Sequence, residues 1–312
     1  MKYKSFLSIT DLSSRELWNL FDTASKLKKE IKKTGKNKEY LKNKVLAMIF
    51  EKPSLRTKVS FAIGMNQLGG HALYLGPTDI CMGKRESVHD VAKVTSSMAD
   101  IIMARTFLHE TILELAKYSS KPVINGLSDL QHPCQILADF LTILEVKKKI
   151  VGIKIAYLGD SENNVAHSLA LASGILGTHF ITASPKGYWM NKVITKSAMT
   201  LAKKQGGSIQ EVIDPNVAVQ NADVVYTDTW VSMGDEAEKE KRLHVFQKYQ
   251  VTELLMKKAN KDAIFMHDLP AYRGNEVETK VIDGLQSVVF QQAENRLHVQ
   301  KALMLYLLKI NL

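Results

Sequence analysis

The loop of residues 51–58 carries side chains that suit a phosphate group. It reads Glu-Lys-Pro-Ser-Leu-Arg-Thr-Lys and lies between an apolar run of strand length and a segment of helical period. The hydroxyls of Ser54 and Thr57, the guanidinium of Arg56 and backbone N–H groups at a helix N-terminus are typical phosphate ligands. A helix start capped by Ser54 would explain the same residues as well. The Walker pattern GxxxxGKS/T is missing from the sequence, so this loop gives no support to ATP hydrolysis.

Three later segments place cations and hydrogen-bond donors where strands end or helices begin. Arg105 directly follows a strand predicted over residues 101–104, and Arg296 opens the last predicted helix. His132 and Gln135 lie at the start of a long predicted helix, where residues three apart share a face. A lone His or Arg is usually structural, but four such residues at the ends of elements indicate a common anionic ligand.

The elements that position these residues form two series of alternating strands and helices. Continuous apolar runs separated by helical segments are typical of a parallel sheet covered on both faces. The first series has predicted strands at residues 45–50, 72–75, 101–104 and 122–125, with helices at 57–68, 88–98 and 110–118. The second series has predicted strands at residues 153–158, 180–183, 224–226 and 264–266, with a helix at 165–176 and further helices between the later strands.

A chain of 312 residues is long for one hydrophobic core, so two domains are expected. A long helix predicted over residues 134–148 joins the two series, and the last helix, predicted over 294–308, is apolar on one side. We therefore predict two doubly wound parallel-sheet α/β domains with the active site in the cleft between them. The first domain comprises residues 1–140, with 294–312 packing back on it, and the second comprises 141–293.

Composition and charge restrict the function further. The net charge of +10 comes from scattered lysines without interleaved aromatic residues, which argues against nucleic-acid binding. The two cysteines, Cys81 and Cys134, cannot supply a disulfide framework. The N-terminal residues do not read as a signal peptide, and no apolar stretch reaches the roughly 20 residues of a membrane helix. We therefore expect a soluble cytoplasmic protein that binds no membrane.

Three motifs resemble the signatures of the aspartate/ornithine carbamoyltransferase family. They are Ser-Leu-Arg-Thr at 54–57, His-Pro-Cys-Gln at 132–135 and Asp-Thr-Trp-Val-Ser-Met-Gly at 228–234, and the last looks like the ornithine branch. The resemblance runs from about residue 5 to residue 305. It implies transfer of the carbamoyl group of carbamoyl phosphate to L-ornithine, giving citrulline and phosphate. It also implies a role in arginine metabolism, with biosynthesis and breakdown both open, and a homotrimer or multiple of trimers in which residues 80–86 reach a neighbouring site.

The resemblance assigns the carbamoyl phosphate ligands residue by residue. It implies that the phosphate is held by Ser54, Leu55, Arg56 and Thr57. Arg105 would bridge the phosphate to the carbamoyl oxygen, and His132 would donate to that oxygen. The carbamoyl amide would lie near Gln135, the backbone at Leu269 and Arg296.

The same resemblance assigns the ornithine ligands. Asn164 would contact the α-carboxylate and Asp228 the α-ammonium, while Ser232 and Met233 close over the substrate. A neutral amine attacks the carbonyl carbon, so preorganised cations and donors suit the charge that develops on oxygen. This chemistry needs no covalent intermediate, cofactor or metal. Three histidines isolated in the sequence are therefore predicted to be structural: His167, His267 and His298.

The largest departure from the family pattern is Asp268 in His-Asp-Leu-Pro at 267–270, where the ornithine branch typically has Cys. Asp268 completes the predicted ornithine-binding and catalytic residues, the latter being Arg56, Arg105, His132, Asp268 and Arg296. Its carboxylate could accept a hydrogen bond from the carbamoyl NH2, hold the ornithine side-chain ammonium in its protonated form, or point elsewhere. Smaller departures, expected to tune affinity, are Lys58, Ala62 and Cys81.

Three other functions remain to be compared with this one. A carbamoyltransferase for another amine such as putrescine would have no use for an α-carboxylate site, so Asp228 and the Ser-Met-Gly loop argue against it. A weakly active homologue that only binds carbamoyl phosphate is favoured by Asp268 alone. A nicotinamide dehydrogenase would need GxGxxG after a strand, and the sequence Gly-Asp-Ser-Glu at 159–162 does not supply it.

Overall fold

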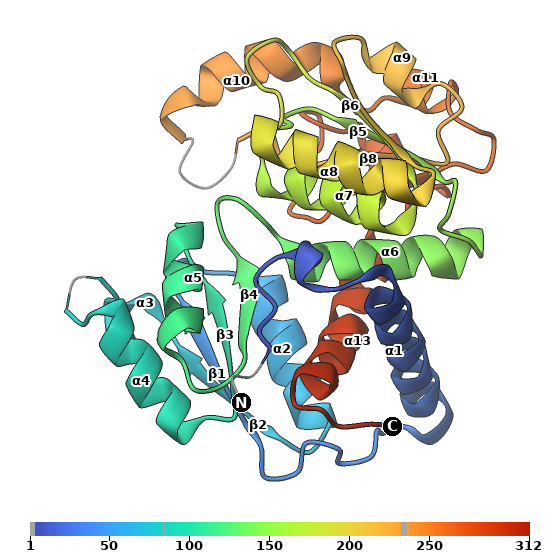
Figure 1. Ribbon diagram of the computed structural model, residues 1–312. Helices are drawn as coiled ribbons and strands as arrows, with labels where there is room; N and C mark the ends of the chain where they lie inside the picture. The colour runs from blue at the N-terminus through green and yellow to red at the C-terminus, as the bar shows by residue number, and fades with distance from the viewer. Residues whose placement is uncertain (1–3, 84, 232–235) are drawn as a thin grey trace. The chain divides into compact units, whose positions relative to one another are not determined.

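The computed structural model describes residues 4–83, 85–231 and 236–312 (Figure 1). It divides into two compact units: Met1–Leu141 together with Glu294–Leu312, and Thr142–Ala293. Both boundaries fall inside helices, the first in α6 (Pro133–Lys147) and the second in α13 (Val289–Leu307). Each unit is described by itself below, as the first unit and the second unit.

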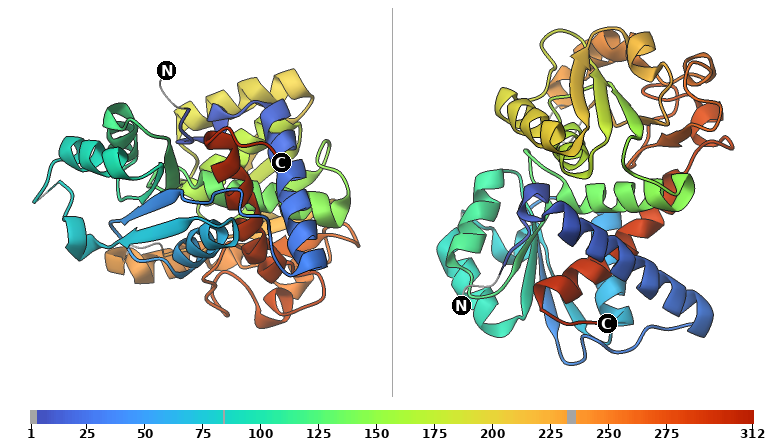
Figure 2. Two further views of the ribbon diagram at one scale, coloured as in Figure 1. Left: turned by 90° about the horizontal axis from the view of Figure 1, so that it is seen from below. Right: turned by 45° about the vertical axis from the view of Figure 1, so that its right-hand side comes forward.

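The first unit is built on a four-stranded parallel sheet of order β2-β1-β3-β4. Its strands are β1 (Val45–Phe50), β2 (His71–Leu75), β3 (Ile101–Arg105) and β4 (Val123–Leu127). On one face lie α4 (Val88–Met98) and α5 (His109–Tyr118), and on the other lie α1 (Ser14–Thr34), α2 (Leu55–Gln67) and α13 (Figures 1 and 2). Two short elements complete the unit: a 3-10 helix at Ile9–Asp11 and α3 (Pro77–Ile80).

Local sequence signals explain the helix ends in this unit. Ser13 caps α1 in a capping box with Glu16, so two backbone N–H groups that the helix cannot satisfy find side-chain acceptors. Gly35 ends the same helix with a φ of 76°, a left-handed conformation that favours glycine. The core under α4 and α5 is made by alternate residues of the strands, such as Ile102, packed on Val91 and Leu115.

The second unit is built on a five-stranded parallel sheet of order β7-β6-β5-β8-β9. Its strands are β5 (Lys154–Leu158), β6 (His179–Ala183), β7 (Ser208–Val212), β8 (Val224–Thr227) and β9 (Ile264–Met266). One face carries α7 (Asn164–Leu176) and α8 (Lys192–Gln205); the other carries α9 (Pro215–Val219), α10 (Lys239–Phe246), α11 (Glu253–Met256) and α12 (Thr279–Ile282) (Figures 1 and 2). Two 3-10 helices flank α10, at Glu236–Glu238 and Gln247–Tyr249.

The predicted fold class, two parallel-sheet α/β domains, is confirmed. Strand β7 was not predicted, because Ser208–Val212 is a partly exposed edge strand without a continuous apolar run. Two site residues also lie differently from the prediction. Arg105 is the last residue of β3, and Arg296 lies inside α13, which begins at Val289.

The strand order reverses once in each sheet, between β1 and β3 in the first unit and between β5 and β8 in the second. At such a point the helices that follow the two strands leave on opposite faces, so the strand ends face an open crevice where ligands bind. The loops after β1, β3, β5 and β8 are therefore the places to look for sites. None of the helices in the described residues combines the length and apolarity needed to cross a membrane.

Candidate functional site

The loop after β1 leads directly into the N-terminus of α2. Ser54 is the N-cap, and its Oγ accepts a hydrogen bond from the Thr57 N–H at 3.4 Å. The first turn of α2 holds Leu55, Arg56 and Thr57 and has no acidic side chain. The partial positive charge of the helix N-terminus is therefore not compensated within this turn, which makes it suitable for an anion. The capping role and the predicted phosphate role of Ser54 are compatible.

Two buried cations lie at the neighbouring ends of β1 and β3. Arg105 is paired with Phe50 in the parallel register, and its carbonyl accepts a hydrogen bond from the Glu51 N–H at 2.9 Å. Lys52 is buried as well, and burial, followed by the charge of Arg105, lowers the pKa of its ammonium group. Lys52 was not among the predicted site residues, although it belongs to the same loop.

Arg296 connects three segments of the first unit. Its guanidinium, 2% exposed, donates to Gln135 Oε1 at 2.6 Å and to Thr57 Oγ1 at 3.2 Å. Gln135 in turn donates through Nε2 to Asp139 Oδ1 at 2.9 Å. His132 lies just before α6, which begins at Pro133, so it does not share a helix face with Gln135 as predicted. The structure nevertheless brings Thr57, Gln135 and Arg296 into direct contact.

The environment of His132 is strongly electropositive. Its side chain is buried, and burial lowers the pKa of the imidazole well below its ordinary value, helped by the charges of Arg296, Arg105 and Arg56 and by that of Lys52. His132 is therefore neutral at neutral pH and can donate a hydrogen bond without adding charge. Several cations directed at one buried neutral donor form a site for a multiply charged anion.

The second unit carries a different set of groups at its own reversal point. Asp228 follows β8, is buried, and accepts hydrogen bonds from the Thr229 N–H at 2.6 Å and from Asn163 Nδ2 at 3.2 Å. Asn163 caps α7 through its Oδ1, which accepts from the Ala166 N–H at 2.8 Å. Asn164 is the first residue of that helix and is partly exposed. Asn163 was not predicted as a site residue, although an Asn at a helix start after a strand was a usable signal.

Asp268 and Asp228 form a buried carboxyl pair. Each offers a carboxylate oxygen, and these atoms lie within 4.8 Å of each other and of a ring nitrogen of His267. The Asp268 side chain is 11% exposed, and its Oδ1 accepts no hydrogen bond in the described structure. Burial, then the charge of Asp268 and a hydrogen bond to it, raises the pKa of Asp228 well above its ordinary value. The pair therefore keeps one proton to higher pH than an isolated carboxyl would.

His267 contacts several polar groups of the second unit, and its structural role stays a prediction. Its Nδ1 accepts a hydrogen bond from the Leu269 N–H at 2.9 Å, which leaves the proton of the neutral ring on Nε2, 3.3 Å from Glu276 Oε1. The sequence alone could not indicate these neighbours of His267. Asp228 lies far from His267 in the chain, and Glu276 lies outside the His-Asp-Leu-Pro motif. Together with Asp228 and Asp268, His267 has a side chain of a kind that binds metal ions. Both of its ring nitrogens, however, are engaged within the protein.

The backbone at Leu269 has a φ of 62°, a left-handed conformation that costs a non-glycine residue on the order of 1 kcal/mol. This conformation is held by the hydrogen bond of its N–H to His267. Such backbone geometry is concentrated at functional sites. Two other predicted ornithine ligands, Ser232 and Met233, lie outside the described residues.

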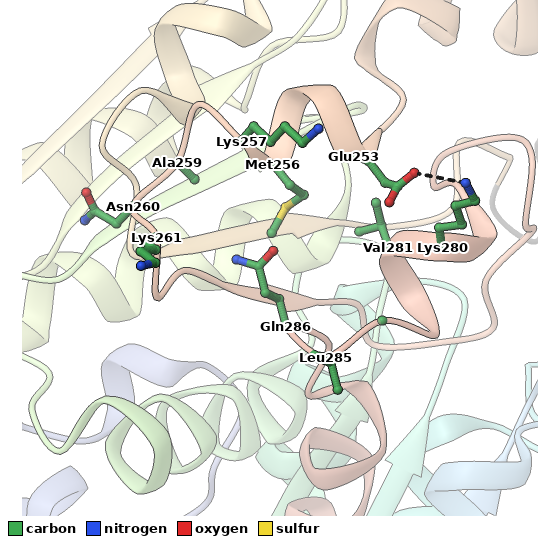
Figure 3. A pocket seen from close by; sticks show the side chains of 11 residues that line it. Glu253, Met256, Lys257, Ala259, Asn260, Lys261, Lys280, Val281, Leu285 and Gln286 are labelled. Carbon is green, nitrogen blue, oxygen red and sulfur yellow. Dashed lines mark ion pairs between the residues drawn. The ribbon is translucent and has the colours of Figure 1, made fainter.

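A separate cavity of about 610 Å³ lies in the second unit (Figure 3). Its lining includes Met256, Lys261 and Gln286, and an ion pair joins Glu253 and Lys280 beside it. Lys261 precedes β9, so the cavity lies at the amino end of that strand, opposite to the edge where parallel sheets bind ligands. It contains none of the predicted site residues.

Comparison with known proteins relates both units to one family. The family model described as "Aspartate/ornithine carbamoyltransferase, carbamoyl-P binding domain" matches residues 4–145, and that of the Asp/Orn binding domain matches residues 151–307. An ornithine carbamoyltransferase of Anoxybacillus flavithermus is 52% identical over 308 residues, which cover 99% of this chain and 98% of that protein. The solved ornithine carbamoyltransferase of Pyrococcus furiosus matches with a TM-score of 0.94 and 49% identity over 97% of this chain and 96% of that one. The anabolic ornithine carbamoyltransferase of Campylobacter jejuni matches with a TM-score of 0.93 and 44% identity over 98% and 99%.

The carboxyl pair predicts a stabilising substitution. Because the pKa of Asp228 is raised in the folded state, its contribution to stability is complete below the ordinary Asp pKa and is lost as the pH rises through the raised value. Replacing Asp268 with Asn removes the like charge, so we expect the melting temperature at pH 8 to rise by roughly 2–4 °C. The gain should shrink as the pH falls, because protonation of Asp228 removes its repulsion with Asp268.

Calorimetry at pH 4, 6 and 8 measures this effect. Asp22→Asn is the matched control, because Asp22 is 62% exposed and pairs with Lys26 on the surface of α1. We expect the control to change the melting temperature little at any pH. An Asp268→Asn protein that is less stable than the parent at pH 8 would contradict the shared-proton interpretation.

Proposed function

Since the chain belongs to the aspartate/ornithine carbamoyltransferase family, we propose that it transfers the carbamoyl group of carbamoyl phosphate to the side-chain amine of L-ornithine, releasing citrulline and phosphate. The observation that carries this proposal is the contrast between the two reversal points. The first is lined by buried cations and donors, as a phosphate requires, and the second by carboxyls and amides, as an α-amino acid requires. The first unit is then the carbamoyl phosphate domain and the second the ornithine domain.

In the first unit, we assign the phosphate to the N-terminus of α2, with Ser54 to Thr57, and to Arg105. His132 donates to the carbamoyl oxygen, and the buried Lys52 adds to the positive field. Arg296 is held by Gln135 and Thr57, so its guanidinium is already fixed before a ligand arrives. Fixed donors of this kind need little reorganisation when charge develops in the transition state.

The chemistry that follows is direct attack by the neutral amine on the carbamoyl carbon. Negative charge develops on the carbamoyl oxygen and then on the departing phosphate. The cations and the neutral His132 stabilise both charges. Collapse of the tetrahedral intermediate breaks the bond to the phosphate oxygen, and the attacking nitrogen gives up a proton to the departing phosphate, which leaves citrulline. The acceptor amine must lose its proton before it can attack.

In the second unit, we assign the α-ammonium of ornithine to Asp228 and the α-carboxylate to Asn164, with Ser232 and Met233 completing the site. Asn163 donates to Asp228 and so fixes the orientation of its carboxyl group. Asp268 contributes the second carboxyl of the pair and is assigned to the neighbourhood of the reacting amine. This arrangement recognises an amino acid rather than a simple diamine.

We also propose that the protein is a homotrimer or a multiple of trimers in the cytoplasm and acts in arginine metabolism. The family similarity over the whole chain supports these assignments. Light scattering coupled to size exclusion tests the assembly, since a mass equal to one chain of 35.0 kDa would exclude the trimer.

A competition assay tests the activity itself. Purified protein is given carbamoyl phosphate with ornithine, putrescine, lysine or aspartate, and each carbamoylated product is quantified. We expect ornithine to be the preferred acceptor by a wide margin in kcat/KM. Preference for putrescine would overturn the assignment of Asp228 and Asn164, and phosphate release without any carbamoylated amine would overturn the proposal as a whole.

Loss of a cation at the first reversal point should lower turnover. We expect Arg105→Ala, and likewise Arg56→Ala, to reduce kcat by roughly 10²-fold or more, because each removes a donor from the place where charge develops. Arg15→Ala is the matched control, since Arg15 lies exposed on α1. Steady-state kinetics and circular dichroism are recorded for all three. A folded Arg105→Ala protein with near-parental turnover would show that the site is elsewhere.

Replacement of Asp268 should change the pH profile. A charged carboxylate beside the acceptor raises the pKa of its ammonium group, because the nearby negative charge favours the protonated form. We therefore expect Asp268→Cys to raise turnover near neutral pH and to give less benefit at high pH, where the amine is already neutral. The test is a pair of pH–rate profiles at saturating substrates. Superimposable profiles would mean that Asp268 does not face the reacting amine.

A further inference from the structure

Arg242 is a buried arginine that no part of the proposed mechanism uses. It lies on α10, and its side chain is 6% exposed. Its Nε donates to the carbonyl oxygen of Trp230 at 2.6 Å, and its NH2 group donates to the carboxylate of Asp160, which is 6% exposed. A buried charge is expensive unless it is paired and hydrogen-bonded, so the contacts with Trp230 and Asp160 matter to the placement of this arginine, as does Glu238 Oε2 at 3.9 Å.

Trp230 and Asp160 belong to the two loops that meet at the reversal point of the second unit. Trp230 lies two residues after Asp228, in the loop that follows β8. Asp160 lies in the loop that follows β5, and its Oδ1 accepts a hydrogen bond from the Glu162 N–H at 2.9 Å, one residue before Asn163. One guanidinium group therefore links the loop of Asp228 to the loop of Asn163 and Asn164.

Aromatic packing holds the guanidinium in this position. Its central carbon lies 5.3 Å from the ring centre of Tyr188 and 5.4 Å from that of Phe246, within the range of cation–π attraction. Phe246 also stacks on Trp230 with 6.0 Å between ring centres. A Cβ atom at Gly159 would lie 3.2 Å from Trp230 Nε1, so the indole ring packs directly against the loop after β5. The contacts around Arg242 thus fix both loops together.

We propose that Arg242 is a positioning residue for the amino-acid substrate, which sets the distance between the group that binds its α-ammonium and the group that binds its α-carboxylate. It acts through Trp230 and Asp160 and does not touch the substrate. The inference rests on the proposed function, because it takes Asp228 and Asn164 as the ornithine ligands. Arginine suits this role because its planar fork directs two donors in fixed directions, whereas a lysine offers one flexible ammonium group.

The consequence is a specificity that can be measured. A substrate with both an ammonium and a carboxylate on the α-carbon must engage both loops at once, so its binding depends on their separation. A diamine such as putrescine engages only the acidic side. Loosening the link should therefore weaken the binding of ornithine more than that of putrescine. It should leave the binding of carbamoyl phosphate unaffected.

The experiment compares Arg242→Lys with Arg273→Lys. Arg273 belongs to the same unit and donates to Asp283 at 3.1 and 2.7 Å, but that pair is exposed, so it is a matched control. We expect Arg242→Lys to raise the KM for ornithine about 10-fold or more, the effect of losing a hydrogen bond to a charged group. The KM for carbamoyl phosphate should stay within about 2-fold, and the kcat/KM ratio of ornithine to putrescine should fall. The control should match the parent.

A second variant guards against misfolding. Asp160→Asn keeps the bond from Arg242 to Trp230 and should shift the same kinetic constants in the same direction. Thermal melts identify folded proteins, and Val281→Ala, a change in the core of the same unit, shows what destabilisation alone does. The inference is wrong if a folded Arg242→Lys protein has a parental KM for ornithine, or if its kcat/KM falls equally for ornithine and putrescine. It is also wrong if neither variant folds. A parent that forms no citrulline at all would instead refute the proposed function.

Discussion

The reversal of strand order in each parallel sheet is the constraint on which the rest of this structure depends. Where β1 neighbours β3, and where β5 neighbours β8, the following helices leave on opposite faces and the strand ends stay uncovered. Buried strands are mostly apolar along their length, so polar chemistry concentrates at their ends. Arg105 and Asp228, at or just after the ends of β3 and β8, are direct results of that rule.

The two reversal points accumulate charge of opposite sign, and both accumulations work against stability. In the first unit burial and then the cations lower the pKa of His132, and in the second burial and then the neighbouring carboxyl raise the pKa of Asp228. Part of each shift therefore comes from like charges that the folded protein holds close together. A ligand of the opposite charge relieves that repulsion, so binding recovers free energy that folding did not. The same charges explain why each site is selective for the sign of its ligand.

The sequence predicted the sheets and most strand-end residues, because buried strands give continuous apolar runs that stop where the chemistry begins. It missed β7, whose edge position permits polar residues such as Gln210 and Glu211. It also missed the partners that exist only in three dimensions. Arg242 and Asp160 are 82 positions apart, and neither sequence segment predicts a contact with the other. Lys52 and Asn163 were within reach, since each lies in a loop that had already been singled out for a neighbour.

Asp268 changes the charge balance at the second reversal point. An ordinary thiol has a pKa of about 8.5, so a cysteine at this position would add no negative charge beside Asp228 at neutral pH. With Asp268 present, burial and then the charge of Asp268 raise the pKa of Asp228, so Asp228 holds its proton to higher pH than it would beside a thiol. A carboxyl in place of a thiol thus disfavours negative charge on the group assigned to the α-ammonium. Arrival of the α-ammonium favours that charge, so substrate binding and the protonation of Asp228 are coupled.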